Sequence, residues 1–372
     1  MLSTIALDTQ VLRPGLCTGC GACQGLCPYW GSVDGRTVCF FDCERRDGRC
    51  QRFCPRMPTD LDALRKRFFP EEAILPEIGP FRGLYLTRAA DPSIRAGAQH
   101  GGSMTALVEL ALKEGLLDAA VLTRSQGGRN PESVLAAAPE EVRSCSGSSF
   151  QVPPTLAVLN QALKEDRYHS IGVVGTPCKT LAVYKMMANP LPENDNHAGN
   201  IGMVFGLFCG WGLDWDGLNA LTAAHADPEK VSHMDIPPSK YHSLELREEG
   251  QTVSVSLDEV TPLVRSGCRY CADMTAEFAD LSIGGARSAE GWDVDKGWNQ
   301  VIVRSEKGQK LLDLAREKGV LECKEAMEGG LEKLRKASQG KKRTAVKNLR
   351  ELTGNPEDLG YLNPSREEFR DL

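Results

Sequence analysis

Cysteines are the residues of this sequence best able to do chemistry, because 14 occur in 372 residues and eight of them lie between positions 17 and 54. The first run follows the pattern C-x2-C-x2-C-x3-C-P and contains Cys17, Cys20, Cys23 and Cys27. Three thiolates within seven residues on a glycine-containing loop can bind three irons of one cubane cluster. The fourth thiolate then binds elsewhere. The run therefore predicts a 4Fe–4S cluster.

A second run of four cysteines ends at Cys54-Pro55 and keeps the closing C-x3-C-P spacing, with looser spacing before it. In bacterial ferredoxins with two clusters, the last cysteine of each run binds the cluster of the other run. This exchange assigns one cluster to Cys17, Cys20, Cys23 and Cys54. It assigns the other cluster to Cys27, Cys39, Cys43 and Cys50. The alternatives are structural zinc, or one intact cluster beside a degenerate second one.

Cys178 and Cys209 each follow an apolar run that is typical of a buried strand. Open α/β sheets bind their ligands at the carboxyl ends of strands. With the C-x2-C pair Cys268 and Cys271, these two cysteines could close a third 4Fe–4S site. The alternative is that Cys178 and Cys209 are small buried hydrophobic residues. Two cysteines match no ligand pattern, and we interpret them as free thiols: Cys145 and Cys323.

Beyond residue 80, apolar runs alternate with amphipathic stretches, which predicts an α/β (α+β) core. The predicted strands are 83–88, 119–124, 168–175 and 200–208. A predicted helix over 103–114 begins directly after Gly101 and Gly102. Glycines at this place let the backbone approach a ligand, and the N–H groups of a first helical turn favour an anion. The stretch lacks the G-x-G-x-x-G fingerprint, so an ordinary dinucleotide fold is not supported and a simple turn is the alternative.

Composition sets limits on the class of protein. The 44 Lys and Arg residues against 50 Asp and Glu give a formal net charge of −6, which disfavours nucleic-acid binding as the main function. No apolar run reaches the ~18 residues of a membrane-spanning helix, and the N-terminus lacks a secretory signal pattern. We therefore expect a cytoplasmic protein in a reducing compartment, where cysteines bind metals more often than they form disulfides.

We expect four segments: a ferredoxin-like iron–sulfur module over 1–58, a linker over 59–80, a core domain over 81–325 and a basic helical C-terminal extension over 326–372. The linker is proline-rich and includes a short charged helix near 60–69. The basic residues of the extension favour a solvated helix face. Docking of an acidic partner or of an anionic substrate tail is the alternative.

Five stretches, taken in order, resemble the coenzyme F420 hydrogenase/dehydrogenase beta-subunit family over about residues 80–320. The stretches are QHGGSMTAL from Gln99, GTPC to Cys178, GLFC to Cys209, CRYCADMTAEFADLSIGG from Cys268, and GWNQVIVR to Arg304. The resemblance implies an oxidoreductase subunit with a flavin-binding core. It would exchange a hydride between coenzyme F420 and FAD, and single electrons with a partner through 4Fe–4S clusters.

The resemblance also implies roles for particular residues. Cys178, Cys209, Cys268 and Cys271 become ligands of a cluster next to the flavin, the third of three 4Fe–4S clusters. The implied FAD contacts are Gly101, Gly102, Ser103, Thr105 and Thr176. Glu277 and Asp280 either orient the flavin or F420 by hydrogen bonding or stabilise local structure. No protein nucleophile is required, because the flavin carries the chemistry, and His100 is the candidate for a proton-transfer role.

Three positions depart from the family pattern: His100, Lys179 and the stretch 148–150. They surround the expected flavin and substrate pocket, so the identity of the hydride partner stays open. The leading hypothesis is a subunit of a redox complex of the hydrogenase, formate dehydrogenase or respiratory F420 dehydrogenase type. In the last case the subunit would be peripheral to the membrane. The alternatives are a subunit that takes electrons from ferredoxin or NAD(P)H for another reductase, and an iron–sulfur adaptor without a functional flavin.

Overall fold

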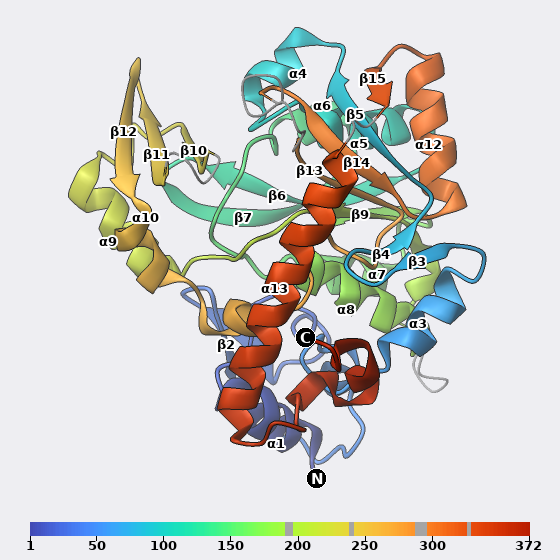
Figure 1. Ribbon diagram of the computed structural model, residues 1–372, viewed down its shortest axis with the longest axis vertical. Helices are drawn as coiled ribbons and strands as arrows, with labels where there is room; N and C mark the ends of the chain where they lie inside the picture. The colour runs from blue at the N-terminus through green and yellow to red at the C-terminus, as the bar shows by residue number, and fades with distance from the viewer. Residues whose placement is uncertain (190–195, 238–241, 287–295, 326–328) are drawn as a thin grey trace.

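The computed structural model describes residues 1–189, 196–237, 242–286, 296–325 and 329–372, and its centre is an eight-stranded mixed sheet (Figure 1). The strand order is β15-β5-β14-β13-β9-β8-β6-β7. The strands have these bounds: β5 Gly83–Ala89, β6 Ala119–Gln126, β7 Arg129–Ala136, β8 Ile171–Gly175, β9 Ile201–Leu207, β13 Leu281–Gly285, β14 Asn299–Val303 and β15 Leu321–Glu325. The four strands predicted from sequence are all present, and the fold is mixed α/β.

Five strands of this sheet point in the same direction. β6, β8, β9 and β13 pair in parallel, and β14 is antiparallel to both β13 and β5, so β5 runs the same way as β13. All five residues of β8 are buried, as expected for a central strand that is covered on both faces. The carboxyl ends of these five strands therefore meet at one edge of the sheet.

Helices cover both faces of the sheet. On one face lie α4 (Pro92–Gly97), α5 (Ser103–Lys113) and α12 (Glu306–Glu317), which pack with β5, β6 and β15. On the other face lie α7 (Thr155–Glu165) and α8 (Pro177–Ala188), which pack on β6 to β9. The predicted helix over 103–114 is thus confirmed as α5. A further short helix, α6 (Pro139–Arg143), packs against α5.

The N-terminal cysteine-rich module lies against α7 and α8 (Figure 1). Leu156 of α7 donates its N–H to the carbonyl of Cys20 at 3.1 Å, and Asn160 Nδ2 donates to the carbonyls of Ala22 at 3.1 Å and Gln24 at 2.7 Å. Buried side chains of the module and of these helices form one continuous hydrophobic cluster. The module elements are α1 Ser3–Leu7, the π-helical turn Asp8–Leu12, β1 Trp30–Val33, β2 Arg36–Cys39 and α2 Arg49–Phe53.

The segment 59–80, expected to be a linker, is also packed into the fold. It contains α3 (Leu61–Phe68), as expected from the sequence, and a hairpin of β3 (Ala73–Leu75) and β4 (Gly79–Phe81). The N–H of Leu61 donates to Ser365 Oγ at 2.8 Å, which ties α3 to the C-terminal segment. The chain between the module and the sheet therefore makes tertiary contacts of its own.

A smaller three-stranded sheet forms a satellite with its own hydrophobic cluster. Its strands pair antiparallel in the order β10-β11-β12. The elements of this part are α9 Trp215–His225, β10 His233–Asp235, β11 Ser243–Glu248, β12 Gln251–Ser256 and α10 Leu257–Val260. It is followed by the 3-10 turns Thr261–Leu263 and Ser266–Tyr270.

The basic C-terminal segment forms the long helix α13 (Gly330–Thr353), followed by the 3-10 segment Gly360–Phe369. The first three residues assigned to this extension, 326–328, lie outside the described residues. The expectation of a wholly solvated basic face is wrong for Lys342, which is buried. It is wrong in part for Lys341, whose Nζ donates to the carbonyls of Cys209 and Gly210 at 2.6 and 2.7 Å. Within the described parts of the chain, every helix is too short or too polar to cross a membrane.

Candidate functional site

Four cysteines of the module lie together and form what we term the middle set: Cys17, Cys20, Cys23 and Cys54. Burial and the neighbouring thiols of Cys178, Cys54 and Cys17 raise the pKa of Cys20. Burial raises the pKa of Cys23 well above its usual value, and Cys20, Cys17 and Cys54 add to the rise. Cys20 and Cys23 belong to one buried cluster, and Cys17 and Cys54 pack against it. The structure thus places Cys54 beside the first run, and its ligation of that cluster stays a prediction.

The other four module cysteines form the outer set: Cys27, Cys39, Cys43 and Cys50. Burial, followed by the thiol of Cys27, raises the pKa of Cys50 to about 11, and Cys43 adds a smaller effect. Burial also raises the pKa of Cys39, with Cys27 among the lesser causes. Cys39 Sγ donates to the carbonyl of Phe41 at 3.2 Å, and the Phe41 side chain is exposed. Cys27, Cys39 and Cys43 are half-buried and Cys50 is buried, so the outer set lies just beneath the surface of the module.

The inner set joins the cysteines of the core domain: Cys178, Cys209, Cys268 and Cys271. Cys178 lies in the first turn of α8 directly after β8, and Cys209 follows β9, its parallel neighbour. Burial raises the pKa of Cys209 to about 12, and the thiols of Cys268, Cys178 and Cys271 contribute. The N–H of Gly212 donates to Cys268 Sγ at 3.3 Å. The structure thus gathers these four thiols at the carboxyl edge of the sheet.

The three sets follow one another in space. Cys178 of the inner set is the thiol with the largest electrostatic effect on Cys20 of the middle set. Cys50 of the outer set in turn acts on Cys23 of the middle set. The order is therefore inner, middle, outer, from the sheet edge to the surface of the module. The two cysteines interpreted as free thiols, Cys145 and Cys323, pack against a different hydrophobic cluster, on the α5 side of the sheet.

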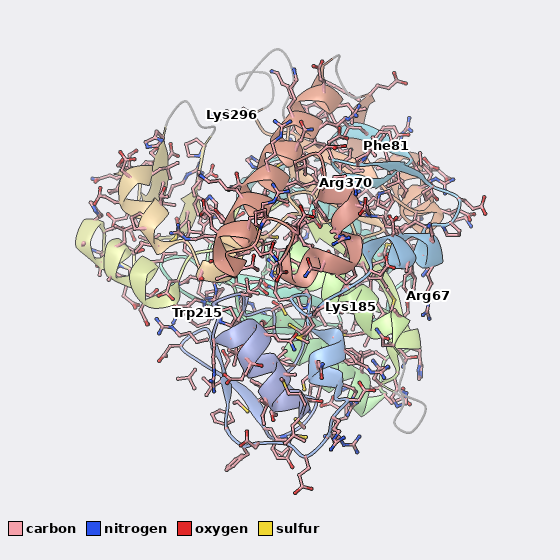
Figure 2. All side chains as sticks on the ribbon, turned by 60° about the horizontal axis from the view of Figure 1, so that its bottom comes forward. Arg67, Phe81, Lys185, Trp215, Lys296 and Arg370 are labelled. Carbon is pink, nitrogen blue, oxygen red and sulfur yellow. The ribbon has the colours of Figure 1, made fainter. Side chains whose placement is uncertain are left out.

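Buried cations surround the inner and middle sets. Arg56, Lys179, Lys185 and Arg265 are all buried, and none pairs with a carboxylate within the described ranges. Lys185 Nζ donates to the carbonyl of Cys54 at 2.6 Å where α8 meets the module, and Figure 2 labels this residue. A buried cation is costly unless a negative charge compensates it. A cluster held by four thiolates is an anion, so the residues around both sets fit such a group.

Among the described residues, no three or more His, Cys, Asp or Glu side chains are placed to hold a single metal ion. A four-iron cluster differs from such a site, because each of its thiolates binds a different iron.

The loop expected to contact flavin lies at the same sheet edge as the inner set. The N–H of Ala89, at the end of β5, donates to the carbonyl of Gly101 at 2.8 Å. The ring of His100 packs on Gly285 at the end of β13, where a Cβ would lie 2.7 Å from His100 Nε2. Gly102 has a φ of 75°, a left-handed conformation that favours glycine, and directly precedes α5. The β13 and β9 strand ends separate this loop from Cys178.

The side chains near this loop differ in whether their polar groups are available to bind a ligand. Ser103 Oγ is buried and hydrogen-bonded to Thr87 Oγ1 at 2.7 Å, so its hydroxyl is already engaged. Its N–H donates to Asn299 Oδ1 at 3.1 Å. Thr105 is half-buried, as is Thr176, whose Oγ1 lies 3.5 Å from Cys178 Sγ. Thr176 is therefore beside the inner set rather than beside Gly101.

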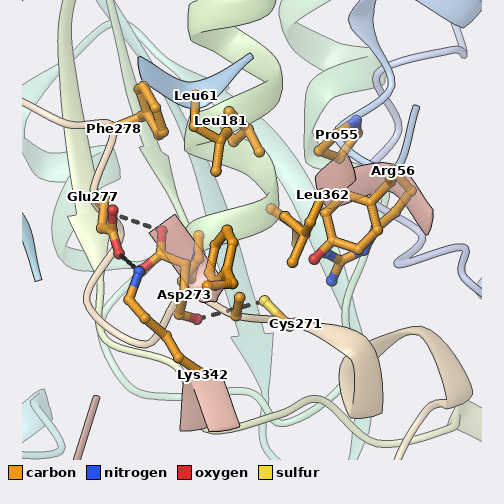
Figure 3. Close-up of a pocket in the computed structure, with 15 residues that line it drawn as sticks. Pro55, Arg56, Leu61, Leu181, Cys271, Asp273, Glu277, Phe278, Lys342 and Leu362 are labelled. Carbon is orange, nitrogen blue, oxygen red and sulfur yellow. Dashed lines mark hydrogen bonds and ion pairs between the residues drawn. The ribbon is translucent and has the colours of Figure 1, made fainter. Parts of the chain in front are cut away.

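Glu277 is placed in a buried ion-pair network (Figure 3). Its Oε2 lies 2.7 Å from Arg65 Nη2 and its Oε1 lies 2.6 Å from Lys342 Nζ. Burial alone would raise the pKa of Glu277, but Lys342 and Arg65 lower it below its usual value. Glu368 completes the network, with its carboxylate 2.6 Å from Arg65 Nη1. These contacts support the alternative that Glu277 stabilises local structure.

Asp280 is likewise engaged within the protein. Its Oδ2 accepts the N–H of Val204 at 2.8 Å, and its Oδ1 accepts the hydroxyl of Ser305 at 2.6 Å. Burial raises the pKa of this carboxyl group. Asp280 thus connects β9 to the start of α12.

Three residues that the structure places near these groups were not predicted from the sequence: Arg56, Lys185 and Asn299. Asn299 lies in the GWNQVIVR stretch, and this stretch was a usable signal. Its side chain connects α5 to β13, because its Nδ2 donates to the carbonyl of Gly284 at 3.2 Å. Arg56 directly follows Cys54-Pro55, and Lys185 is in α8. No spacing rule distinguishes a buried cation from an exposed one at either position.

Two family profiles match the chain, and both describe the beta subunit of coenzyme F420 hydrogenase/dehydrogenase. The profile of its N-terminal part matches residues 84–160, and the profile of its C-terminal part matches residues 168–329. The coenzyme F420 hydrogenase subunit beta of Methanococcus voltae is 30% identical, over 73% of this chain and 95% of its own length. A subunit of the F(420)H(2) dehydrogenase of Methanosarcina mazei is 26% identical, over 92% of this chain and 94% of its own length.

A solved structure also resembles the chain. It belongs to the F420-reducing [NiFe] hydrogenase complex from Methanosarcina barkeri, solved with xenon, and aligns with a TM-score of 0.68 at 26% identity. The alignment covers 75% of this chain and 94% of the other.

Proposed function

Because the chain belongs to the coenzyme F420 hydrogenase/dehydrogenase beta-subunit family, we propose that it exchanges a hydride between coenzyme F420 and FAD, and single electrons with a partner complex. It would do so as an iron–sulfur flavoprotein subunit in the cytoplasm, acting as an oxidoreductase. The observation that carries the proposal is the row of three thiol sets, which begins at the sheet edge that bears the Gly101–Gly102 loop.

The chemistry of the substrate explains why both a flavin and iron–sulfur clusters are needed. A deazaflavin gives or takes two electrons at once, whereas a 4Fe–4S cluster takes one. FAD, when bound, accepts a hydride and releases electrons singly. The chain would supply twelve thiolates in three sets of four, and buried cations that compensate the charge of the inner and middle clusters.

The residues at the sheet edge would bind and orient the flavin. The backbone around Gly101 and Gly102 can approach a ligand closely, and the first N–H groups of α5 favour a phosphate. Thr105 offers a half-buried hydroxyl on the first turn of α5. Asn299 would act indirectly, since its amide connects the start of α5 to β13. His100, packed on Gly285, is the titratable group at this edge that could hold a proton.

The N-terminal module would carry electrons to or from the partner. Less than a tenth of the chain lies outside the match to the Methanosarcina mazei dehydrogenase, so that match includes part of the module. Three of the four outer-set cysteines are half-buried and Cys39 lies beside the exposed Phe41, which makes this set the expected exchange point with another subunit. A respiratory complex of the F420H2 dehydrogenase type is therefore the partner class we favour.

The departures at His100 and Lys179 favour a second candidate, in which ferredoxin or NAD(P)H replaces F420 as the electron source. His100 lies at the expected hydride edge and Lys179 adjoins the inner set.

Stopped-flow mixing of the anaerobic protein with reduced F420, and separately with NADH, tests the proposal. We expect reduced F420 to bleach the bound flavin rapidly, while NADH leaves the flavin oxidised. Bleaching by NADH alone would favour the second candidate. Protein with iron but no acid-released FAD would instead indicate an iron–sulfur adaptor.

A further inference from the structure

Arg56 occupies a position that connects two of the thiol sets. Its backbone N–H donates to Cys54 Sγ of the middle set at 3.4 Å. Its guanidinium extends to the inner set, because Arg56 lines one pocket together with Cys178 and Cys271, and both thiols help to raise its pKa against the effect of burial. One residue therefore lies beside cysteines of both sets, directly after the Cys-Pro pair that ends the second run.

The environment of the guanidinium holds it in place. Nη2 donates to the carbonyl of Gly267 at 3.1 Å, and Nη1 donates to the hydroxyl of Tyr361. The guanidinium carbon lies 4.6 Å from the centre of the Tyr361 ring. Tyr361 belongs to the C-terminal 3-10 segment, and its hydroxyl in turn donates to the carbonyl of Tyr270 at 2.8 Å. Arg56 is thus fixed between the module, the inner-set loop and the C-terminal segment (Figure 3).

The charge of Arg56 has no carboxylate partner among the described residues, although the residue is only 4% exposed. Its Nε is buried and has no hydrogen-bond acceptor in the described part of the chain. An arginine does not lose its proton in proteins, so this charge must be compensated by neighbouring groups. The groups available are the cysteines of the inner and middle sets, which become anionic when they bind iron.

We propose that Arg56 is a positioning residue shared by the inner and middle clusters, whose charge raises the reduction potential of both relative to the outer cluster. This inference rests on the proposed function, because it requires iron at both sets. Net charge and hydrogen bonds to sulfur are among the factors that set cluster potentials. A single cation between two clusters raises the reduction potentials of both. The difference between the two potentials therefore stays small, and an electron is stabilised on the inner and middle clusters.

Redox titrations of the full-length anaerobic protein, followed by electron paramagnetic resonance, test this inference. The variants are Arg56→Met and Arg56→Lys. The control is Arg269→Met, which removes an exposed arginine between Cys268 and Cys271. Iron per chain is measured first. Wild-type protein without iron would reject the proposed function itself, and with it the premise of this inference.

We expect Arg56→Met to shift two of the three cluster potentials to more negative values and to leave the third unchanged. Arg56→Lys should restore most of the shift, because it keeps the charge. Arg269→Met should change little, since water screens an exposed charge. Iron loss in Arg56→Met that Arg56→Lys restores would also support the inference. Unchanged potentials in Arg56→Met, a shift of one cluster alone, or equal iron loss in both Arg56 variants would overturn it.

Discussion

Lys342 Nζ lies 2.6 Å from Glu277 Oε1, with both side chains buried. This ion pair joins α13, whose basic residues favoured a solvated face, to a carboxylate for which either a flavin contact or a local structural role was expected. Arg65 of α3 contacts the same carboxylate at 2.7 Å. Three segments that are far apart in the chain are therefore held together by one carboxylate.

Glu277→Gln should destabilise the protein by about 3–5 kcal/mol, because it leaves two buried cations short of a counter-charge. Denaturant unfolding of the holoprotein measures this loss. Glu332→Gln is the matched control, since Glu332 forms an exposed pair with Lys336 and its removal should cost less than about 1 kcal/mol. Flavin content per folded chain should stay at the wild-type level. Loss of FAD without loss of stability would instead assign Glu277 to the flavin.

The same carboxylate should contribute to acid unfolding. Lys342 and Arg65 lower the pKa of Glu277 in the folded protein despite its burial. A lowered folded pKa means that the stabilisation is present above the unfolded pKa of about 4.3 and is lost as pH falls through the folded value. Below a pH of about 4.3, stability should therefore decline more steeply in wild type than in Glu277→Gln, while the two proteins should respond alike between that pH and neutrality. Parallel pH–stability curves for the two proteins would contradict this assignment.

Sequence reasoning predicted part of the arrangement because that part depends on local patterns. Cys178 and Cys209 follow strands whose apolar runs identify them, and the spacing of the two cysteine runs implied that Cys54 joins the first run. Glu277 could not be interpreted in this way. Its partners Arg65 and Lys342 are 212 and 65 residues away in sequence. Only the tertiary fold brings them together.

Pairs of cysteine substitutions should show which cysteines bind the cluster of the middle set and which bind the cluster of the outer set. Cys20→Ala and Cys54→Ala belong to one set, so the double variant should lose the same iron as either single variant, about four atoms per chain. Cys50→Ala combined with Cys54→Ala crosses the two sets and should lose about eight. Iron analysis of the anaerobic proteins measures both, with Cys145→Ala as the control that loses none. Additive loss in the first pair would show that Cys20 and Cys54 bind different clusters.

Gly102→Ala should weaken both stability and FAD binding. The residue has a φ of 75°, and a Cβ would lie 2.9 Å from Ile94 Cγ2. Gly115→Ala is the matched control, because Gly115 has a φ of 66° at the other end of α5 but no atom within 4 Å of the added Cβ. Each variant should lose about 1–2 kcal/mol from the left-handed backbone. Only Gly102→Ala should release FAD, measured after acid treatment and normalised to folded protein; equal FAD contents would remove this loop from the flavin site.

The central claim is that three cysteine sets hold three four-iron clusters in a row. Combined iron, acid-labile sulfide and zinc analysis of anaerobically purified protein tests it most directly. We expect about twelve irons and twelve sulfides per chain. Zinc without sulfide, or only about four irons per intact chain, would contradict it.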